Sequence, residues 1–149
     1  MTARRPHGFT LVEILIVVVI MAVLAATIIP QFTDSAKDAK ANTALFNLHT
    51  LRAQIELYKT NHDGKVPTTL DLLTEKTNRA GTTNSGDGAL VHGPYIHSIP
   101  DNPLVDSAFA DVVTAPAANP PVAAEADAGW LYDSATGELW INHADYLDE

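Results

Sequence analysis

The sequence contains no cysteine among its 149 residues. This absence excludes a disulfide framework, a thiolate zinc site and a cysteine nucleophile. Basic residues are also scarce: the chain has 9 lysines and arginines against 18 aspartates and glutamates, and residues 80–149 contain none of the 9. Because nucleic-acid binding depends on basic residues that neutralise phosphates, the net charge of −9 argues against a nucleic-acid partner.

Patterns typical of enzymes are missing as well. The six histidines show no His-x-x-x-His spacing, and the chain has neither a Gly-x-Ser-x-Gly motif nor a phosphate-binding loop. We therefore predict no catalytic residues and no enzymatic activity, and we expect the histidines to lie on the surface. The acidic half has four candidate calcium ligands, which are Asp101, Asp106, Asp127 and Asp133. They lack the spacing of an EF-hand loop, so we assign no metal site.

One long apolar run lies near the N-terminus, at residues 9–29. Its 21 residues are interrupted only by two threonines and Glu13. A helix of that length is roughly 31 Å long, which matches the hydrocarbon core of a bilayer. The basic pair Arg4-Arg5 precedes the run and predicts a cytoplasmic N-terminus, with the rest of the chain exported.

Two other interpretations of residues 1–29 remain open. An ordinary signal peptide would be cleaved after Val23-Leu24-Ala25 and would leave Ala26 as the first residue. The run is longer than the core of about 7–15 residues that is usual for a signal peptide, and Glu13 interrupts it early. The second alternative is a plain membrane anchor.

Residues 30–62 continue the helical pattern in amphipathic form. Pro30 removes a backbone donor, so it either kinks the helix or breaks it locally. Gly64 suits the left-handed position that ends many helices. We expect the apolar stripe of this segment to pack on the protein's own sheet, with a partner-binding face as the alternative; its residues are Ala41, Leu45, Leu48, Leu51, Ile55 and Tyr58.

Residues 63–149 predict a small domain with few regular elements. Trp130–Tyr132 and Leu139–Ile141 flank a turn-forming sequence and predict a hairpin. Residues 112–128 contain seven alanines and three prolines, and we expect no regular structure there. The other expected elements are a helix at Leu70–Lys76 with a capping box at Thr68 and Asp71, a loop at residues 78–93 and an extended segment at Tyr95–Ile99. The predicted fold class is α+β, with a long N-terminal helix packed on a small antiparallel sheet.

The segment Gly8-Phe9-Thr10-Leu11-Val12-Glu13, which opens the apolar run, resembles the leader of type IV prepilins. That superfamily includes the type IV pilins and the pseudopilins of type II secretion. The resemblance implies a pilin-like fold and a leader at residues 1–8. It also implies that prepilin peptidase cleaves between Gly8 and Phe9 and methylates the new N-terminus of Phe9, and that Glu13 guides a subunit into a growing filament. Pro30 would be the helix kink.

Downstream segments resemble the major, G-type pseudopilin of type II secretion. These segments are residues 58–73 (YKTNHDGKVPTTLDLL) and residues 93–103 (GPYIHSIPDNP). The chain departs from that family after Asn102-Pro103, where the family usually continues Asp-Pro-Trp-Gly-x-Pro and ends in an acidic, Gly-rich calcium loop. A bound calcium ion is therefore the one cofactor that the resemblance raises, and the sequence does not contain a recognisable loop for it.

The position of Glu13 also has a physical explanation. A carboxylate in the apolar part of a membrane helix costs ~2.5–3.5 kcal/mol unless it finds a partner. Cleavage would remove both arginines of the leader and create an ammonium group at Phe9, about one turn from Glu13. We expect this ammonium of one subunit to pair with Glu13 of its neighbour, because such an attraction is much stronger in a dry filament core than in water.

The expected function is that of a structural subunit of a type II secretion pseudopilus. The implied partners are copies of the chain, minor pseudopilins, the inner-membrane assembly platform and prepilin peptidase. The implied location is the bacterial inner membrane, with a single span and a periplasmic C-terminal domain. One alternative is a type IV pilin used in adhesion, motility or DNA uptake. Another is a membrane-anchored periplasmic binding module that uses the hairpin with Trp130 and Trp140 as its binding surface.

Overall fold

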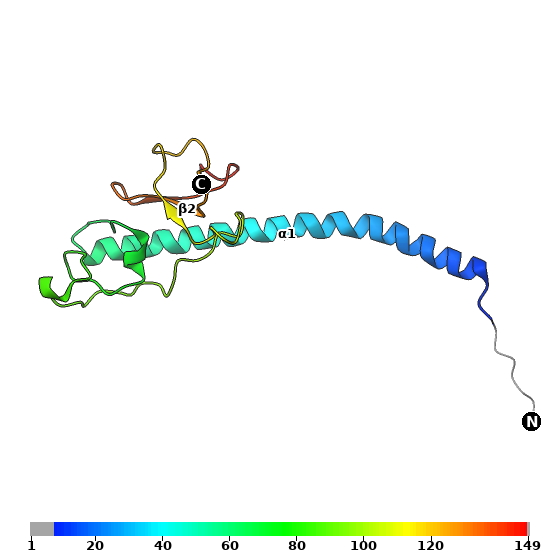
Figure 1. Cartoon of the computed structure of the whole chain (residues 1–149), viewed down its shortest axis with the longest axis horizontal. Helices are drawn as coiled ribbons and strands as arrows, with labels where there is room; N and C mark the ends of the chain where they lie inside the picture. The colour runs from blue at the N-terminus through cyan, green and yellow to red at the C-terminus, as the bar shows by residue number, and fades with distance from the viewer. Residues whose placement is uncertain (1–7, 149) are drawn as a thin grey trace, which may run out of the picture. The chain divides into compact units, whose positions relative to one another are not determined.

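The computed structural model describes residues 8–148, so the Arg4-Arg5 pair and the rest of residues 1–7 lie outside the described part. The elements follow in the order α1 (Leu11–Asn61), η1 (Leu70–Leu73), η2 (Ser85–Asp87), β1 (Val113–Thr114), β2 (Trp130–Asp133) and β3 (Glu138–Ile141), as Figure 1 shows. Here η denotes a short 3₁₀ helix. The chain divides into two compact units, and the division falls after Ala39.

The first unit contains the N-terminal part of α1. The helix continues through position 30, so the local break that we considered for Pro30 is not observed. The Thr27 hydroxyl donates to the carbonyl of Leu24 at 2.9 Å, and the Thr33 hydroxyl donates to that of Ile29 at 3.2 Å. These bonds satisfy the polar groups of both threonines inside the helix, so neither interrupts the apolar surface with an unpaired hydroxyl.

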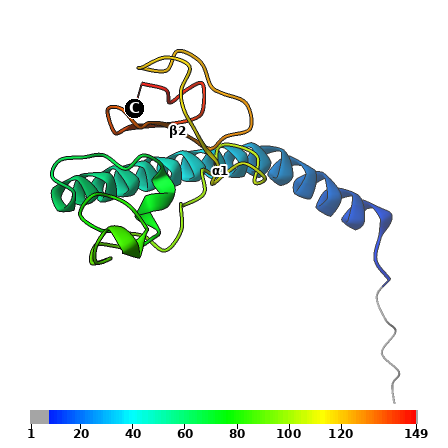
Figure 2. The same ribbon diagram turned by 60° about the vertical axis from the view of Figure 1, so that its left-hand side comes forward.

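The second unit, from Lys40 onward, has a core formed between α1 and the C-terminal hairpin. In both views, the hairpin (orange) lies along one side of the C-terminal part of α1, and most of residues 63–95 (green) lie on another side (Figures 1 and 2). The expected apolar stripe is therefore the inner face of the helix, although Ala41 and Leu45 are only half-buried. The buried cluster consists of Ala44, Leu48, Leu51, Ile55, Tyr58, Leu70, Leu73, Trp130, Tyr132, Leu139 and Ile141.

The end of α1 is made by two consecutive left-handed residues. Gly64 has φ +81°, as its position predicted, and Asp63 before it has φ +56°. The N–H of Gly64 donates to the carbonyl of Lys59 at 2.9 Å, which satisfies one of the last helical acceptors. Arg79 donates to both carboxylate oxygens of Asp63, and this contact lowers the pKa of that carboxyl.

The three-stranded sheet has the order β1-β2-β3. It is a mixed sheet, whereas we predicted an antiparallel one. The strands β2 and β3 form the expected antiparallel hairpin, with Trp130 opposite Ile141. The strand β1 pairs parallel with β2, with Val113 opposite Trp130. The expectation that residues 112–128 lack regular structure is therefore wrong at β1. Val113 and Thr114 form a strand because they pair with Trp130 and Leu131 of β2.

Two smaller predictions, the helix at Leu70–Lys76 and its capping box, are also wrong. The element η1 has only four residues, and its N-cap, Thr69, makes no capping bond with its side chain. The Leu73 carbonyl accepts the N–H groups of Tyr95 and Ile96 at 2.7 and 3.1 Å, so it is not available to extend a helix. These tertiary bonds end the helix early and hold the Tyr95 segment without making it a strand.

His62 contradicts the expectation that the histidines lie on the surface, because it is completely buried. Its ring stacks on that of Tyr58, with 3.7 Å between the ring centroids. Its Nδ1 lies 2.7 Å from the Tyr58 carbonyl and its Nε2 lies 2.8 Å from the Thr77 hydroxyl. Both ring nitrogens therefore have hydrogen-bond partners, which satisfies the polar atoms of this buried side chain.

Candidate processing and assembly site

Residues 8–10 precede the helix, so the bond predicted to be cleaved lies outside regular structure. Gly8 is exposed, and a side chain added there would meet no atom within 4 Å. The Phe9 side chain is 81% exposed. The alternative cleavage position after Ala25 lies inside α1. Of the two bonds, only the one between Gly8 and Phe9 lies outside the helix.

Thr10 and Glu13 form a capping box at the start of α1. Glu13 Oε2 accepts hydrogen bonds from the Thr10 N–H at 2.8 Å and from the Thr10 hydroxyl at 2.9 Å. In return, the Glu13 N–H donates to Thr10 Oγ1 at 3.2 Å. The Thr-x-x-Glu spacing is the sequence signal of this motif, and our sequence analysis did not use it.

The capping box explains how Glu13 is positioned, but it does not neutralise the carboxylate. Both bonds from Thr10 go to the same oxygen, Oε2. Within residues 8–148, Glu13 has no ion-pair partner. The local arrangement therefore presents a carboxylate, held by its own turn, close to the place where cleavage would create a new amino terminus.

The apolar side chains that follow Glu13 are not covered by any part of the described chain. Large hydrophobic side chains from Phe9 to Phe32 are 44–82% exposed. This part of α1 is long and apolar enough to cross a membrane, a test that a signal sequence near the N-terminus also passes. An apolar surface this large needs a nonaqueous environment, either lipid or other helices.

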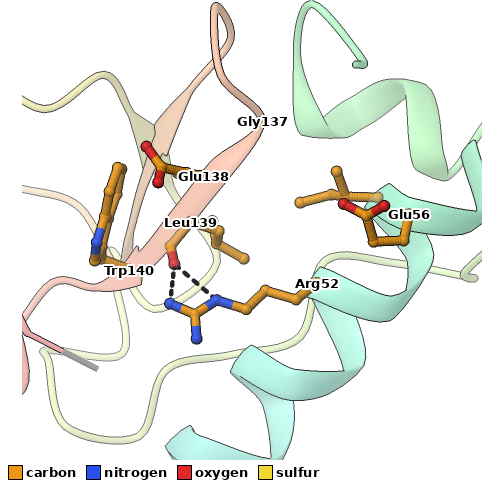
Figure 3. Close-up of a pocket in the computed structure, with 7 residues that line it drawn as sticks. Arg52, Glu56, Gly137, Glu138, Leu139 and Trp140 are labelled. Carbon is orange, nitrogen blue, oxygen red and sulfur yellow. Dashed lines mark hydrogen bonds between the residues drawn. The ribbon is translucent and has the colours of Figure 1, made fainter. Parts of the chain in front are cut away.

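A pocket of about 390 Å³ lies between α1 and β3. Figure 3 shows Arg52 reaching from α1 to the Leu139 carbonyl, to which its Nε and Nη2 donate at 3.1 and 2.8 Å. Glu56 and Glu138 also line the pocket, and its lining contains no histidine, serine, threonine or lysine. Arg52 thus ties the edge strand to the helix, which is a structural role.

The hairpin tryptophans are not the binding surface that one alternative required. Trp130 is 0% exposed and its indole N–H donates to the Pro100 carbonyl at 2.8 Å. Trp140 is only 7% exposed. The predicted hairpin is confirmed, but its aromatic rings belong to the interior and leave little area for a partner.

The four candidate calcium ligands do not converge. Within the described residues there is no group of three or more histidines and carboxylates that could hold a metal ion. Asp106 Oδ1 accepts the N–H of Ala108 at 2.9 Å, which is a local turn contact. The Ala135 N–H and, as a weaker cause, the Asn119 amide hold the pKa of the Asp133 carboxyl below its usual value. Asp101 and Asp127 are exposed.

Comparison with known proteins supports the motif and extends beyond it. Residues 3–29 match the prokaryotic N-terminal methylation motif. The type II secretion system core protein G of Aeromonas hydrophila is 31% identical over 106 residues, which are 69% of this chain and 71% of that protein. The core protein G of Dickeya chrysanthemi is 32% identical over 99 residues, 66% of this chain. That match spans only about half of the Dickeya protein, 55% of its length.

A relative that carries a different name is also similar. The ComG operon protein 3 homolog of Bacillus licheniformis is 32% identical over 68 residues, which are 46% of this chain and 70% of that protein. No solved structure gives a significant match. The apolar N-terminal helix and the core protein G relatives fit a protein anchored in the inner membrane. By its sequence similarity and its α+β fold, the chain belongs to the type IV pilin-like superfamily as a G-type pseudopilin, the family of type II secretion system core protein G.

Proposed function

We propose that the chain is a structural subunit of a type II secretion pseudopilus that helps to export folded proteins. Prepilin peptidase cleaves it between Gly8 and Phe9 and methylates Phe9, and the mature subunits polymerise through the N-terminal part of α1. The observation that carries this proposal is the uncovered apolar helix surface from Phe9 to Phe32, which begins directly at an exposed Gly-Phe bond.

The uncovered surface is consistent with both proposed states of the subunit, membrane-bound and assembled. Before assembly, lipid would surround the apolar side chains and the helix would anchor the subunit in the inner membrane. Burial of each Val, Leu or Ile side chain is worth about 1.5–3 kcal/mol relative to water. In a filament, the corresponding helices of neighbouring copies would cover the same side chains. A single surface can therefore serve the membrane-bound and the assembled subunit.

Glu13 supports assembly because its charge is unfavourable in lipid and has no cationic partner within residues 8–148. The Thr10 bonds occupy Oε2 and orient the carboxylate. After cleavage, the methylated ammonium of Phe9 in a neighbouring subunit would provide the missing positive charge. The pairing would then favour a subunit in the filament over one alone in the membrane.

The remaining parts of the proposal concern location and partners. The N-terminus is cytoplasmic and the domain from Lys40 onward is periplasmic. The partners are copies of the chain, minor pseudopilins and the inner-membrane assembly platform. The chain has no catalytic role of its own, and the chemistry at Gly8 and Phe9 belongs to prepilin peptidase. The core protein G names of its relatives support this assignment.

The second candidate function is that of a type IV pilin for adhesion, motility or DNA uptake. The N-terminal methylation motif at residues 3–29 is consistent with it, because the resemblance of Gly8–Glu13 covers type IV pilins as well as pseudopilins. The two candidates share processing and polymerisation and differ in the surrounding machinery. Genes for an outer-membrane secretin and a secretion ATPase next to this gene would support the pseudopilus.

Substitution of Glu13 tests the proposed assembly mechanism. Glu13→Leu removes the charge from the apolar part of α1, so membrane insertion and cleavage should persist while the yield of filaments falls to background. Glu13→Gln is the matched control for capping, because its side-chain carbonyl can still accept from Thr10. We expect the Gln variant to fail in assembly as well, since it lacks the charge. Filament yield is measured by shearing and electron microscopy in a strain that has no wild-type copy.

Filaments at wild-type yield from either variant would show that the charge pairing is wrong. A filament defect in Glu13→Leu alone would assign the residue to capping of α1. Cleavage is followed in the same samples by mass spectrometry, so a failure in processing is distinguished from a failure in assembly.

A further inference from the structure

The turn of the β2–β3 hairpin brings two carboxylates together. Asp133 and Glu138 are directly opposite each other in the antiparallel register. Like charges in this position repel each other and destabilise the pair of strands. The family resemblance implies that a calcium ion relieves such repulsion in G-type pseudopilins, so this carboxylate pair has to be tested for a fit to calcium.

In this chain a side-chain amide lies between the two carboxylates. Asn119 Nδ2 donates to Asp133 Oδ2 at 2.6 Å and to Glu138 Oε2 at 2.8 Å. It also lies 3.3 Å from the Thr136 hydroxyl. The amide must present its nitrogen here, because its oxygen would face two carboxylate oxygens that can only accept.

Further donors around the turn satisfy the same carboxylates. The Ala135 N–H donates to Asp133 Oδ1 at 2.8 Å. The Thr136 hydroxyl donates to Glu138 Oε2 at 3.0 Å. A calcium site needs six to eight oxygen ligands, as a rough guide. At this turn the central position is occupied by a nitrogen that carries hydrogens, and no third carboxylate joins the pair within residues 8–148. The residues present therefore do not fit a calcium ion.

We propose that the Asn119 amide replaces a divalent cation at this turn, so that the domain of this pseudopilin folds without calcium. Asn119 belongs to the connection between β1 and β2, and Asp133 and Glu138 belong to the hairpin. The amide therefore fastens the Ala- and Pro-rich connection to the hairpin by hydrogen bonds alone. This inference concerns the domain from Lys40 onward and does not depend on the proposed role in secretion.

Thermal unfolding of the full chain in a nonionic detergent tests the proposal. Tryptophan fluorescence reports on the hairpin directly, because Trp130 lies in β2 and Trp140 in β3. The wild-type Tm should be the same in a chelator, in magnesium and in micromolar calcium, at about 150 mM sodium chloride to keep screening constant. Asn119→Ala should lower the Tm by about 4 °C in all three conditions.

Asn119→Asp provides the decisive comparison, because it places a third carboxylate between Asp133 and Glu138. In chelator this variant should have a lower Tm than Asn119→Ala, owing to charge repulsion. Calcium, but not magnesium at the same concentration, should raise its Tm. The charge-matched control is Asn84→Asp, which adds the same charge in another loop and keeps the oxygen that accepts the Gly86 N–H.

Three results would overturn the proposal. The first is a wild-type Tm that rises in calcium but not in magnesium, which would reveal a calcium site. The second is an Asn119→Ala variant with the wild-type Tm, which would show that the amide holds nothing. The third is an Asn119→Asp variant that calcium does not stabilise, or stabilises no more than Asn84→Asp, which would show that the amide does not stand where a cation would bind.

Discussion

Thr10 gives Glu13 a hydrogen-bonding partner within its own chain, and this contact bears on how the carboxylate can act. Isolated in lipid, an unsatisfied carboxylate would be more costly than one that accepts two hydrogen bonds. The bonds at 2.8 and 2.9 Å reduce this cost while leaving the charge in place. The carboxylate is thus tolerable in the membrane-bound subunit and still able to attract a cation from a neighbour.

At the residue scale, Gly8 provides the test of processing. Gly8→Glu places a bulky charge beside the scissile bond and should abolish cleavage, whereas Gly8→Ala adds a single methyl group into open space and should retain most of it. Mass spectrometry of membrane fractions should find mature wild-type chains that begin at methylated Phe9. A mature chain that begins at Ala26 would instead identify an ordinary signal peptide.

The hairpin β2–β3 is the element that closes the core over α1, and its turn depends on a close approach of the backbone. Gly137 has φ +82°, and a Cβ there would lie 2.5 Å from Val66 Cγ1. Val66 is β-branched and has little rotameric freedom to move away. The glycine is therefore required both for its backbone conformation and for the space that it leaves.

A pair of alanine substitutions separates these two requirements at the element scale. Gly64 has φ +81°, but a Cβ there would meet no atom within 4 Å. Gly64→Ala should lower the free energy of unfolding by about 1 kcal/mol through its backbone alone. Gly137→Ala should cost at least about 1 kcal/mol more because it also collides with Val66. Urea denaturation followed by tryptophan fluorescence measures both, and equal losses would contradict the steric argument.

The whole molecule has an uneven distribution of charge. All 9 lysines and arginines lie within residues 1–79, whereas residues 80–149 carry eleven carboxylates and no basic side chain. Some of these carboxylates are stabilised locally by hydrogen bonds, as at Asp133. The others repel one another across the surface of the domain, and this repulsion opposes the compact state.

At the scale of the whole molecule, we therefore expect sodium chloride to stabilise the protein. Exposed charges are screened within ~8–10 Å at physiological ionic strength, so the Tm of the full chain in nonionic detergent should rise as salt increases from low concentration. Glucose at matched osmolality is the uncharged control and should not reproduce the rise below physiological salt. A Tm that does not respond to salt would mean that the carboxylates are already compensated within the fold.

Local patterns in the sequence were sufficient to predict the features that depend on neighbouring residues. The apolar run at residues 9–29 and the stripe from Leu48 to Tyr58 predict one helix with two different surfaces, because helical spacing alone decides which side chains share a face. The hairpin was predictable because a short turn-forming sequence between Asp133 and Glu138 joins its two strands. The leader motif depends only on the order of residues from Gly8 to Glu13.

Only the tertiary structure decided the features that join distant parts of the chain. The pairing of Val113 with Trp130 makes a strand within a stretch whose composition favours none, because the hydrogen bonds come from β2. Burial of His62 depends on Thr77, which is not its neighbour in the sequence. Asn119 is an ordinary loop residue until the fold places it between Asp133 and Glu138. A hydrogen-bonding partner supplied from elsewhere can override local propensity, and no local pattern records where that partner will come from.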